Sequence, residues 1–178
     1  MRALLLPLTL LCTTLATTSL TAQSRRILMP GVRGVPPSEL IDTMGTPREV
    51  PYTASKVFAA MEKVYESLKV KPEIHAAPAQ IGNQALYSRG KFAGHRMSAI
   101  LDCGGGMTGL YADSYRIYLG LVTFIEENPG RTSTVRTVLV GNALNVTEGV
   151  RPTQKCRSVG ELEAKMHDMM LKELAKTP

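Results

Sequence analysis

The stretch 115–140, YRIYLGLVTFIEENPGRTSTVRTVLV, carries the strongest β-strand signal of this 178-residue chain. In 115–126 side chains alternate between two faces, and both faces are apolar near the middle, which is typical of a central strand. Asn128-Pro129-Gly130 supplies a turn, because proline fixes φ and glycine accepts a positive φ. The segment 131–143 returns as a second strand, with apolar side chains at Val135, Val138, Leu139 and Val140. We therefore expect a long hairpin at the centre of a mainly antiparallel sheet.

Two amphipathic helices are expected on either side of this hairpin in the sequence. Residues 54–69 carry apolar side chains at a 3.6-residue period, namely Val57, Phe58, Met61, Val64, Tyr65 and Leu68. Residues 158–174 carry a methionine-rich stripe, namely Val159, Leu162, Met166, Met169, Met170 and Leu174. Both stripes are expected to pack against the sheet, although methionine-rich faces also occur on adaptable binding surfaces.

The region between the first helix and the hairpin gives weaker signals. Residues 73–76 and 81–89 have the character of short strands, and 97–103 fits either a strand or one helical turn. Together the elements predict a two-layer α+β domain, a mainly antiparallel sheet of about 4–5 strands with two helices on one face. A helix-grip-like layout, in which the sheet wraps partly around the last helix, fits the same order. We assign residues 53–178 to this single domain.

The first 22 residues have the order of a secretory signal peptide. Arg2 gives the positive start, an apolar run follows, and a small polar stretch leads to Ala22, after which we expect cleavage. A retained membrane anchor is the alternative, but the apolar run is shorter than the roughly 20 residues that span a bilayer. We expect an exported protein, periplasmic or secreted, with no transmembrane segment after cleavage. Residues 23–52, rich in proline and glycine, are expected to form an extended or loosely ordered arm.

Cleavage would leave two cysteines, Cys103 and Cys156. In an oxidising compartment such a pair usually forms a disulfide. The link would close a loop of about 50 residues, worth on the order of 4 kcal/mol. A redox-active pair or a catalytic thiol is the alternative. No metal site is expected, because the three histidines show no short spacing with the cysteines, the histidines being His75, His95 and His167.

The net charge of the chain is +6. Since Arg2 is the sole charged residue of the first 22, removal of this segment leaves +5. This moderate excess favours anionic neighbours such as lipid headgroups or cell-wall polymers. Nucleic-acid binding is not expected, because the sequence has no clustered stripe of basic and aromatic residues. The densest basic cluster is a candidate anion-binding site, with a solvated loop as the alternative, and it consists of Arg89, Lys91, His95 and Arg96.

Two further patterns concern chemistry. Residues 104–109, GGGMTG, match the G-x-G-x-x-G spacing of dinucleotide sites, but no amphipathic helix follows that could hold a pyrophosphate. We therefore expect a turn beside the disulfide and no cofactor. A general acid and base for a hydrolase could come from one small set, Asp102, Asp113, His75 and His95. Asn145-Val146-Thr147 is a glycosylation sequon.

These observations favour a non-catalytic exported module of the cell envelope that binds a protein partner or an anionic envelope component. An exported hydrolase that uses the aspartate and histidine residues above is one alternative. A carrier that holds an apolar small ligand between the sheet and the methionine-rich last helix is another.

Overall fold

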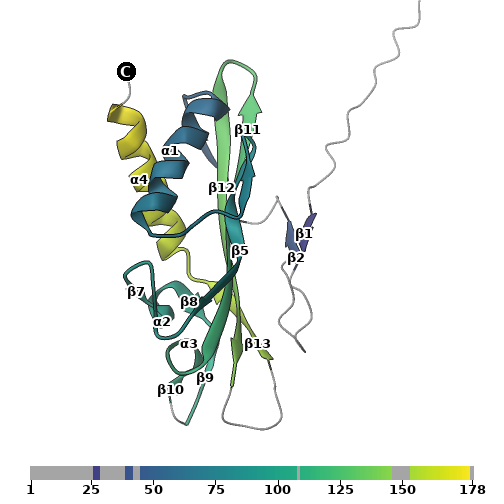
Figure 1. Cartoon of the computed structure of the whole chain (residues 1–178), viewed down its shortest axis with the longest axis vertical. Coiled ribbons are helices and arrows are strands. Elements are labelled where there is room, and N and C mark those ends of the chain that lie inside the picture. The colour runs from purple at the N-terminus through teal and green to yellow at the C-terminus, as the bar shows by residue number, and fades with distance from the viewer. Residues whose placement is uncertain (1–25, 29–38, 42–44, 108, 146–152, 177–178) are drawn as a thin grey trace, which may run out of the picture.

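The computed structural model describes residues 26–28, 39–41, 45–107, 109–145 and 153–176. The expected signal peptide, residues 1–22, lies outside these residues. Within them the chain forms an α+β domain whose main sheet has seven strands, all joined by antiparallel pairings (Figure 1). The expected number of 4–5 strands was therefore too low. The additional strands are short and largely polar, so their sequences carry little hydrophobic alternation.

The predicted hairpin is confirmed. Strands β11 (Arg116–Asn128) and β12 (Thr132–Leu144) pair without interruption from Arg116↔Leu144 to Asn128↔Thr132. In the turn, Gly130 and Arg131 have φ values of +89° and +64°. Because successive side chains of a strand point to opposite faces, the hairpin presents one apolar set to each side of the sheet.

The sheet order is β4–β5–β11–β12–β13–β8, and β3 also pairs with β12. The bounds are Ile74–Ala76 for β4, Gln80–Ser88 for β5, Thr153–Ser158 for β13, Leu101–Asp102 for β8 and Arg48–Val50 for β3. Strands β3 and β13 share one edge of β12, since β3 pairs with residues 133–135 and β13 with residues 140–144. Residues 136–139 of β12 thus face a break between two strands.

Helices α1 (Ala54–Ser67) and α4 (Glu161–Lys176) lie side by side on one face of the sheet (Figure 1). Four side chains of α4 are at most 4% exposed and belong to the main core, namely Leu162, Met166, Met170 and Leu174. Val159 does not belong to this stripe, because it precedes the helix and is 48% exposed. Helices α2 (Met97–Ile100) and α3 (Tyr111–Ser114) are single turns.

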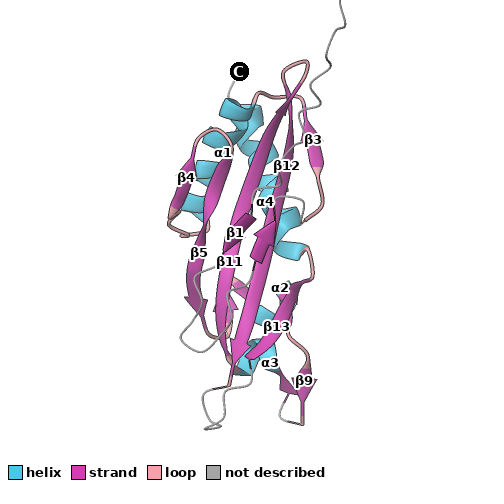
Figure 2. Cartoon of the chain, turned by 90° about the vertical axis from the view of Figure 1, so that its right-hand side faces the viewer, coloured by secondary structure: helices cyan, strands magenta, loops and turns pink. Residues whose placement is uncertain are grey.

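A smaller apolar cluster lies on the opposite face of the sheet. Val122, Phe124 and Val138 are buried there, with Ile74 and Val140 packed against them. The hairpin of β1 (Arg26–Leu28) and β2 (Glu39–Ile41) lies on this side, as Figures 1 and 2 show. The described residues of the expected N-terminal arm thus form three short strands, of which β3 joins the main sheet.

The predicted disulfide is present between Cys103 and Cys156, with an S–S distance of 1.98 Å and a Cα–Cα distance of 4.1 Å. Both cysteines are buried. The bridge adjoins the pairing of Asp102 with Arg157, so it ties β8 to β13. Within the described part of the chain, no helix has the length and apolar character needed to cross a membrane.

Candidate functional site

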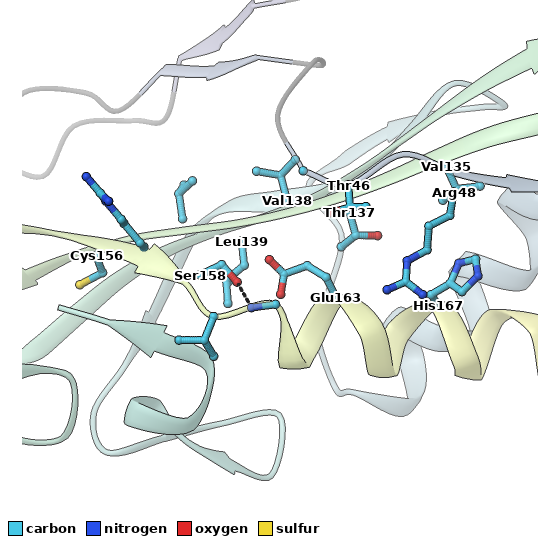
Figure 3. Close-up of a pocket in the computed structure, with 15 residues that line it drawn as sticks. Thr46, Arg48, Val135, Thr137, Val138, Leu139, Cys156, Ser158, Glu163 and His167 are labelled. Carbon is cyan, nitrogen blue, oxygen red and sulfur yellow. Dashed lines mark hydrogen bonds between the residues drawn. The ribbon is translucent and has the colours of Figure 1, made fainter.

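A pocket of about 480 Å³ opens at the break in the sheet between β3 and β13. Residues Thr137 to Val140 of β12 form one wall (Figure 3). Gly45 and Thr46, just before β3, form another, and the end of β13 with the first turns of α4 completes the enclosure. The volume falls in the range of sites for small ligands.

Four ionisable side chains line this pocket, namely Arg48, Arg157, Glu163 and His167. Glu163 and His167 stand four residues apart, so they share one face of α4, and Figure 3 shows the Arg48 side chain extending from β3 toward His167. The Glu163 Oε2 atom is buried and has no hydrogen-bond partner among the described residues. Within that part of the chain no ion pair joins Glu163 to Arg48 either. Opposite charges therefore share one cavity without neutralising each other directly.

The pKa of His167 is lowered from its ordinary value of 6.5. Partial burial of the ring is the main cause, because burial disfavours the charged form, and the positive charge of Arg48 acts in the same direction. Asp168 opposes both effects. At neutral pH His167 is therefore an uncharged ring that can both donate and accept a hydrogen bond.

A chain of hydroxyl groups connects the pocket to the core. The Tyr65 hydroxyl lies 3.2 Å from the Ile81 carbonyl oxygen, 3.3 Å from that of Leu121 and 3.3 Å from Thr123 Oγ1. Thr123 Oγ1 lies 3.0 Å from the Oγ1 atom of Thr137, which lines the pocket. Burial raises the pKa of Tyr65 far above its usual value, so the hydroxyl stays protonated. Sequence periodicity placed Tyr65 in the core but gave no sign of this polar role.

The structure brings three of the four predicted anion-binding residues onto one small hairpin. Strands β6 (Lys91–Phe92) and β7 (His95–Arg96) pair Lys91 with Arg96. Arg89, which is exposed, lies just after β5 and before this hairpin. Lys165 of α4 joins the group, because its Nζ atom lies 2.9 Å from His95 Nε2. The sequence pattern missed Lys165, which is 70 residues away along the chain.

One acid lies against this basic hairpin. Arg96 Nη2 donates to Asp113 Oδ2 at 2.8 Å, and Asp113 also accepts hydrogen bonds from the backbone N–H and the hydroxyl of Ser98. Slight burial tends to raise the pKa of Asp113, but the hydrogen bonds from Ser98 and the charge of Arg96 outweigh it and lower the pKa. Asp113 therefore stays ionised and holds β7 and α2 against α3.

Among the described residues, no hydrogen bond joins any two of the four residues considered for acid–base chemistry. Asp102 accepts a hydrogen bond from the Gly104 N–H at 2.9 Å, and Asp113 is engaged as described above. His75 Nε2 lies 2.6 Å from Glu62 Oε1, and His95 lies beside Lys165. Each of the four side chains thus has a separate partner.

Two sequence motifs take ordinary structural roles. The glycine pattern 104–109 contains the small hairpin of β9 (Gly105–Gly106) and β10 (Gly109–Leu110), followed by the single turn α3. Asn145 of the sequon is buried, and its Nδ2 atom, the atom to which a glycan would attach, donates to the Tyr115 hydroxyl at 3.1 Å. Modification of Asn145 would require this side chain to leave its position.

Comparisons with known proteins assign no function to this chain, so the functional argument rests on the structure. No family model matches this chain, and no curated protein or solved structure matches it. In the residues that the structure describes, no group of three or more histidine, cysteine, aspartate or glutamate side chains could hold a metal ion.

Proposed function

We propose that the protein is an exported, non-catalytic binding module of the cell envelope, and that its basic hairpin contacts an anionic envelope component. The observation that carries this proposal is the meeting of Lys91, His95 and Arg96 on one hairpin with Lys165 of α4. One carboxylate, that of Asp113, pairs with Arg96. The remaining excess of positive charge favours an anionic surface or polymer.

Export is part of the same proposal. The disulfide between Cys103 and Cys156 is compatible with an oxidising compartment outside the cytosol. Residues 1–22 would be removed as a signal peptide. We also propose that the α+β domain has two layers in a helix-grip-like arrangement.

Two observations favour this reading over the alternatives. The separate partners of Asp102, Asp113, His75 and His95 do not support a hydrolase built on these residues. The burial of Met166 and Met170, both 0% exposed, supports a core role for the methionine-rich stripe rather than a lining for an apolar ligand.

Cosedimentation with lipid vesicles tests the proposal. We expect the purified protein to bind vesicles that contain phosphatidylglycerol and not vesicles of phosphatidylcholine alone, and to release them as salt is raised. A soluble polyphosphate competitor distinguishes recognition of an anionic polymer from recognition of a lipid headgroup. If neither the anionic vesicles nor the polymer bind, the proposal is wrong.

A charge-reversed pair of variants locates the surface. Basic residues near an anionic membrane contribute about 1 kcal/mol each, so Lys91→Glu with Lys165→Glu should weaken binding about thirtyfold or more. Lys69→Glu with Lys71→Glu is the matched control, because these exposed residues lie after α1 and change the net charge equally. Equal losses in both variants would show that net charge, not the hairpin, determines binding.

A further inference from the structure

Among the described residues, the carboxylate of Glu163 is one of three buried side-chain groups with an atom that lacks a hydrogen-bond partner, the others being the amides of Gln80 and Gln84. Its Oε2 atom is buried in the pocket without a donor, and a buried acceptor that lacks a partner is destabilising. The nearby hydroxyl of Thr137 is hydrogen-bonded to Thr123. Ser158, another pocket residue, accepts a hydrogen bond from the Gly160 N–H at 3.0 Å. The oxygen of Glu163 therefore needs a donor that the described residues do not supply.

The other end of the pocket has the opposite character. Arg48 is exposed, and among the described residues it has no carboxylate partner. His167 stands beside it and can donate a hydrogen bond from its ring (Figure 3). A guanidinium group with an adjacent imidazole N–H suits a carboxylate, which accepts hydrogen bonds on both of its oxygens. A ligand for this pocket should therefore carry a hydrogen-bond donor for Glu163 and an anionic group for Arg48.

We propose that this pocket binds a short zwitterionic peptide of about two residues. Its amino group meets Glu163, and its terminal carboxylate meets Arg48 and His167. Cβ atoms at positions i and i+4 of a helix are about 5–6 Å apart, and two extended residues span about 7 Å. A dipeptide is therefore long enough to reach from Glu163 to His167.

The rest of the lining agrees with this ligand class. Small apolar side chains of the peptide would contact Val135 and Leu139, the pocket residues that belong to the main core on the helix face of the sheet. Residues 136–139 of β12 pair with β11 on one side, and no described strand pairs with them on the other. A peptide backbone could hydrogen-bond to this edge as an added strand segment does. This site is separate from the basic hairpin, so peptide binding and binding to an anionic surface can be tested independently.

Calorimetric titration with alanyl-alanine tests the ligand class on the unaltered protein. We expect measurable binding of the free dipeptide and at least a tenfold weaker affinity for its N-acetyl and its C-amide forms, because each modification removes one charged end. Absence of binding at millimolar concentration, or equal binding of the doubly blocked dipeptide, would overturn the proposal. This series needs no variant and therefore does not depend on whether a variant folds.

Variants then assign each end of the peptide to a side chain. In Glu163→Gln the preference for the free amine over the N-acetyl form should disappear, while the preference for the free carboxylate remains. Arg48→Gln should show the reverse pattern. Glu161→Gln, an exposed acid on the same helix, is the matched control and should bind as the unaltered protein does. Both peptide-site variants should keep full binding to anionic vesicles, and unchanged dipeptide preferences in both would refute the assignment.

Discussion

The polar cluster around Tyr65 of α1 and the polar pocket around Glu163 of α4 are built differently. The Tyr65 hydroxyl has three oxygen neighbours within 3.3 Å, although its side chain is fully buried. Glu163 Oε2 is buried too, but among the described residues it has no hydrogen-bond partner. A polar group that serves stability is normally satisfied by the fold itself. The Tyr65 cluster therefore serves the stability of the fold, whereas the Glu163 pocket fits the proposed role as a ligand site.

The local state of the sheet explains the difference. Tyr65 packs where β11 has a neighbouring strand on each side, next to a register shift in its pairing with β5 between Leu119 and Leu121, and backbone carbonyls of β5 and β11 reach its hydroxyl. Glu163 stands opposite the break between β3 and β13, where β12 has no neighbouring strand on that side. Neighbouring strands supply backbone carbonyls as partners for a buried polar group. Where a neighbouring strand is missing, these partners are missing too, and a cavity takes their place.

Removal of the disulfide should lower the free energy of unfolding most, because the bridge closes a long loop. Cys156 also belongs to the pocket wall. Replacing Cys103 and Cys156 by alanine opens a covalent loop with a sequence separation of 53. The chain-entropy relation gives a loss of about 4 kcal/mol in the free energy of unfolding. Urea unfolding of the variant and of the unaltered protein measures it. Loss below about 1 kcal/mol would mean that the bridge adds little to the frame of the pocket.

Tyr65→Phe should have the next largest effect. The substitution keeps the ring but leaves the oxygens of Ile81, Leu121 and Thr123 without their shared partner. We expect a loss of about 1–3 kcal/mol in the free energy of unfolding, measured by urea denaturation. Tyr87→Phe is the matched control, since Tyr87 is 52% exposed, and it should change stability very little. Equal effects in both variants would contradict the structural role given to the Tyr65 cluster.

The sequence predicted the parts of the fold that depend on local hydrophobic pattern. The hairpin 115–143, the helix that begins at Ala54 and the bridge of Cys103 with Cys156 follow from side-chain periodicity and from compartment. The break in the sheet could not be predicted in this way. It depends on where β3 and β13 attach to the edge of β12, and these strands are short and polar.

The candidate sites show the same limit. The sequence indicated Lys91, His95 and Arg96 because they are neighbours in the chain, and it missed Lys165 because α4 brings it there from a distance. Glu163 and His167 are four residues apart, a spacing that is common on exposed helix faces. Their convergence with Arg48 depends on tertiary contacts, and no motif records it.

Glu163→Gln should cost much less stability than Tyr65→Phe. The carboxylate oxygen has no donor to lose, and its negative charge near the start of α4 contributes only about 0.3–1 kcal/mol through the helix dipole. A neutral amide in the pocket lowers the desolvation penalty, which offsets this loss. We expect a change below about 1 kcal/mol in urea unfolding. A loss as large as that of Tyr65→Phe would mean that Glu163 serves the fold and not a ligand.

The smallest effect is a dependence of stability on pH that arises from His167. Its pKa in the folded protein lies below the ordinary value of 6.5. The unfolded chain therefore binds more protons than the folded chain as pH falls below about 6.5, so the free energy of unfolding decreases there and is unaffected at higher pH. His167→Gln lacks this decrease. Urea unfolding at pH 7.5 and pH 5.5 should thus give a smaller drop for the variant.

The charged groups around His167 modify the size of this drop in the free energy of unfolding, to which burial of the ring contributes most. Arg48 from β3 lowers the pKa of His167, and Asp168 on α4 acts against it. Arg48→Gln should therefore reduce the drop in stability between pH 7.5 and pH 5.5, although burial of the ring preserves part of it. A bound peptide carboxylate would oppose the charge of Arg48 in the same way. Saturating alanyl-alanine should accordingly diminish the pH dependence of the unaltered protein, whereas the C-amide form should leave it unchanged, because that form brings no negative charge to His167.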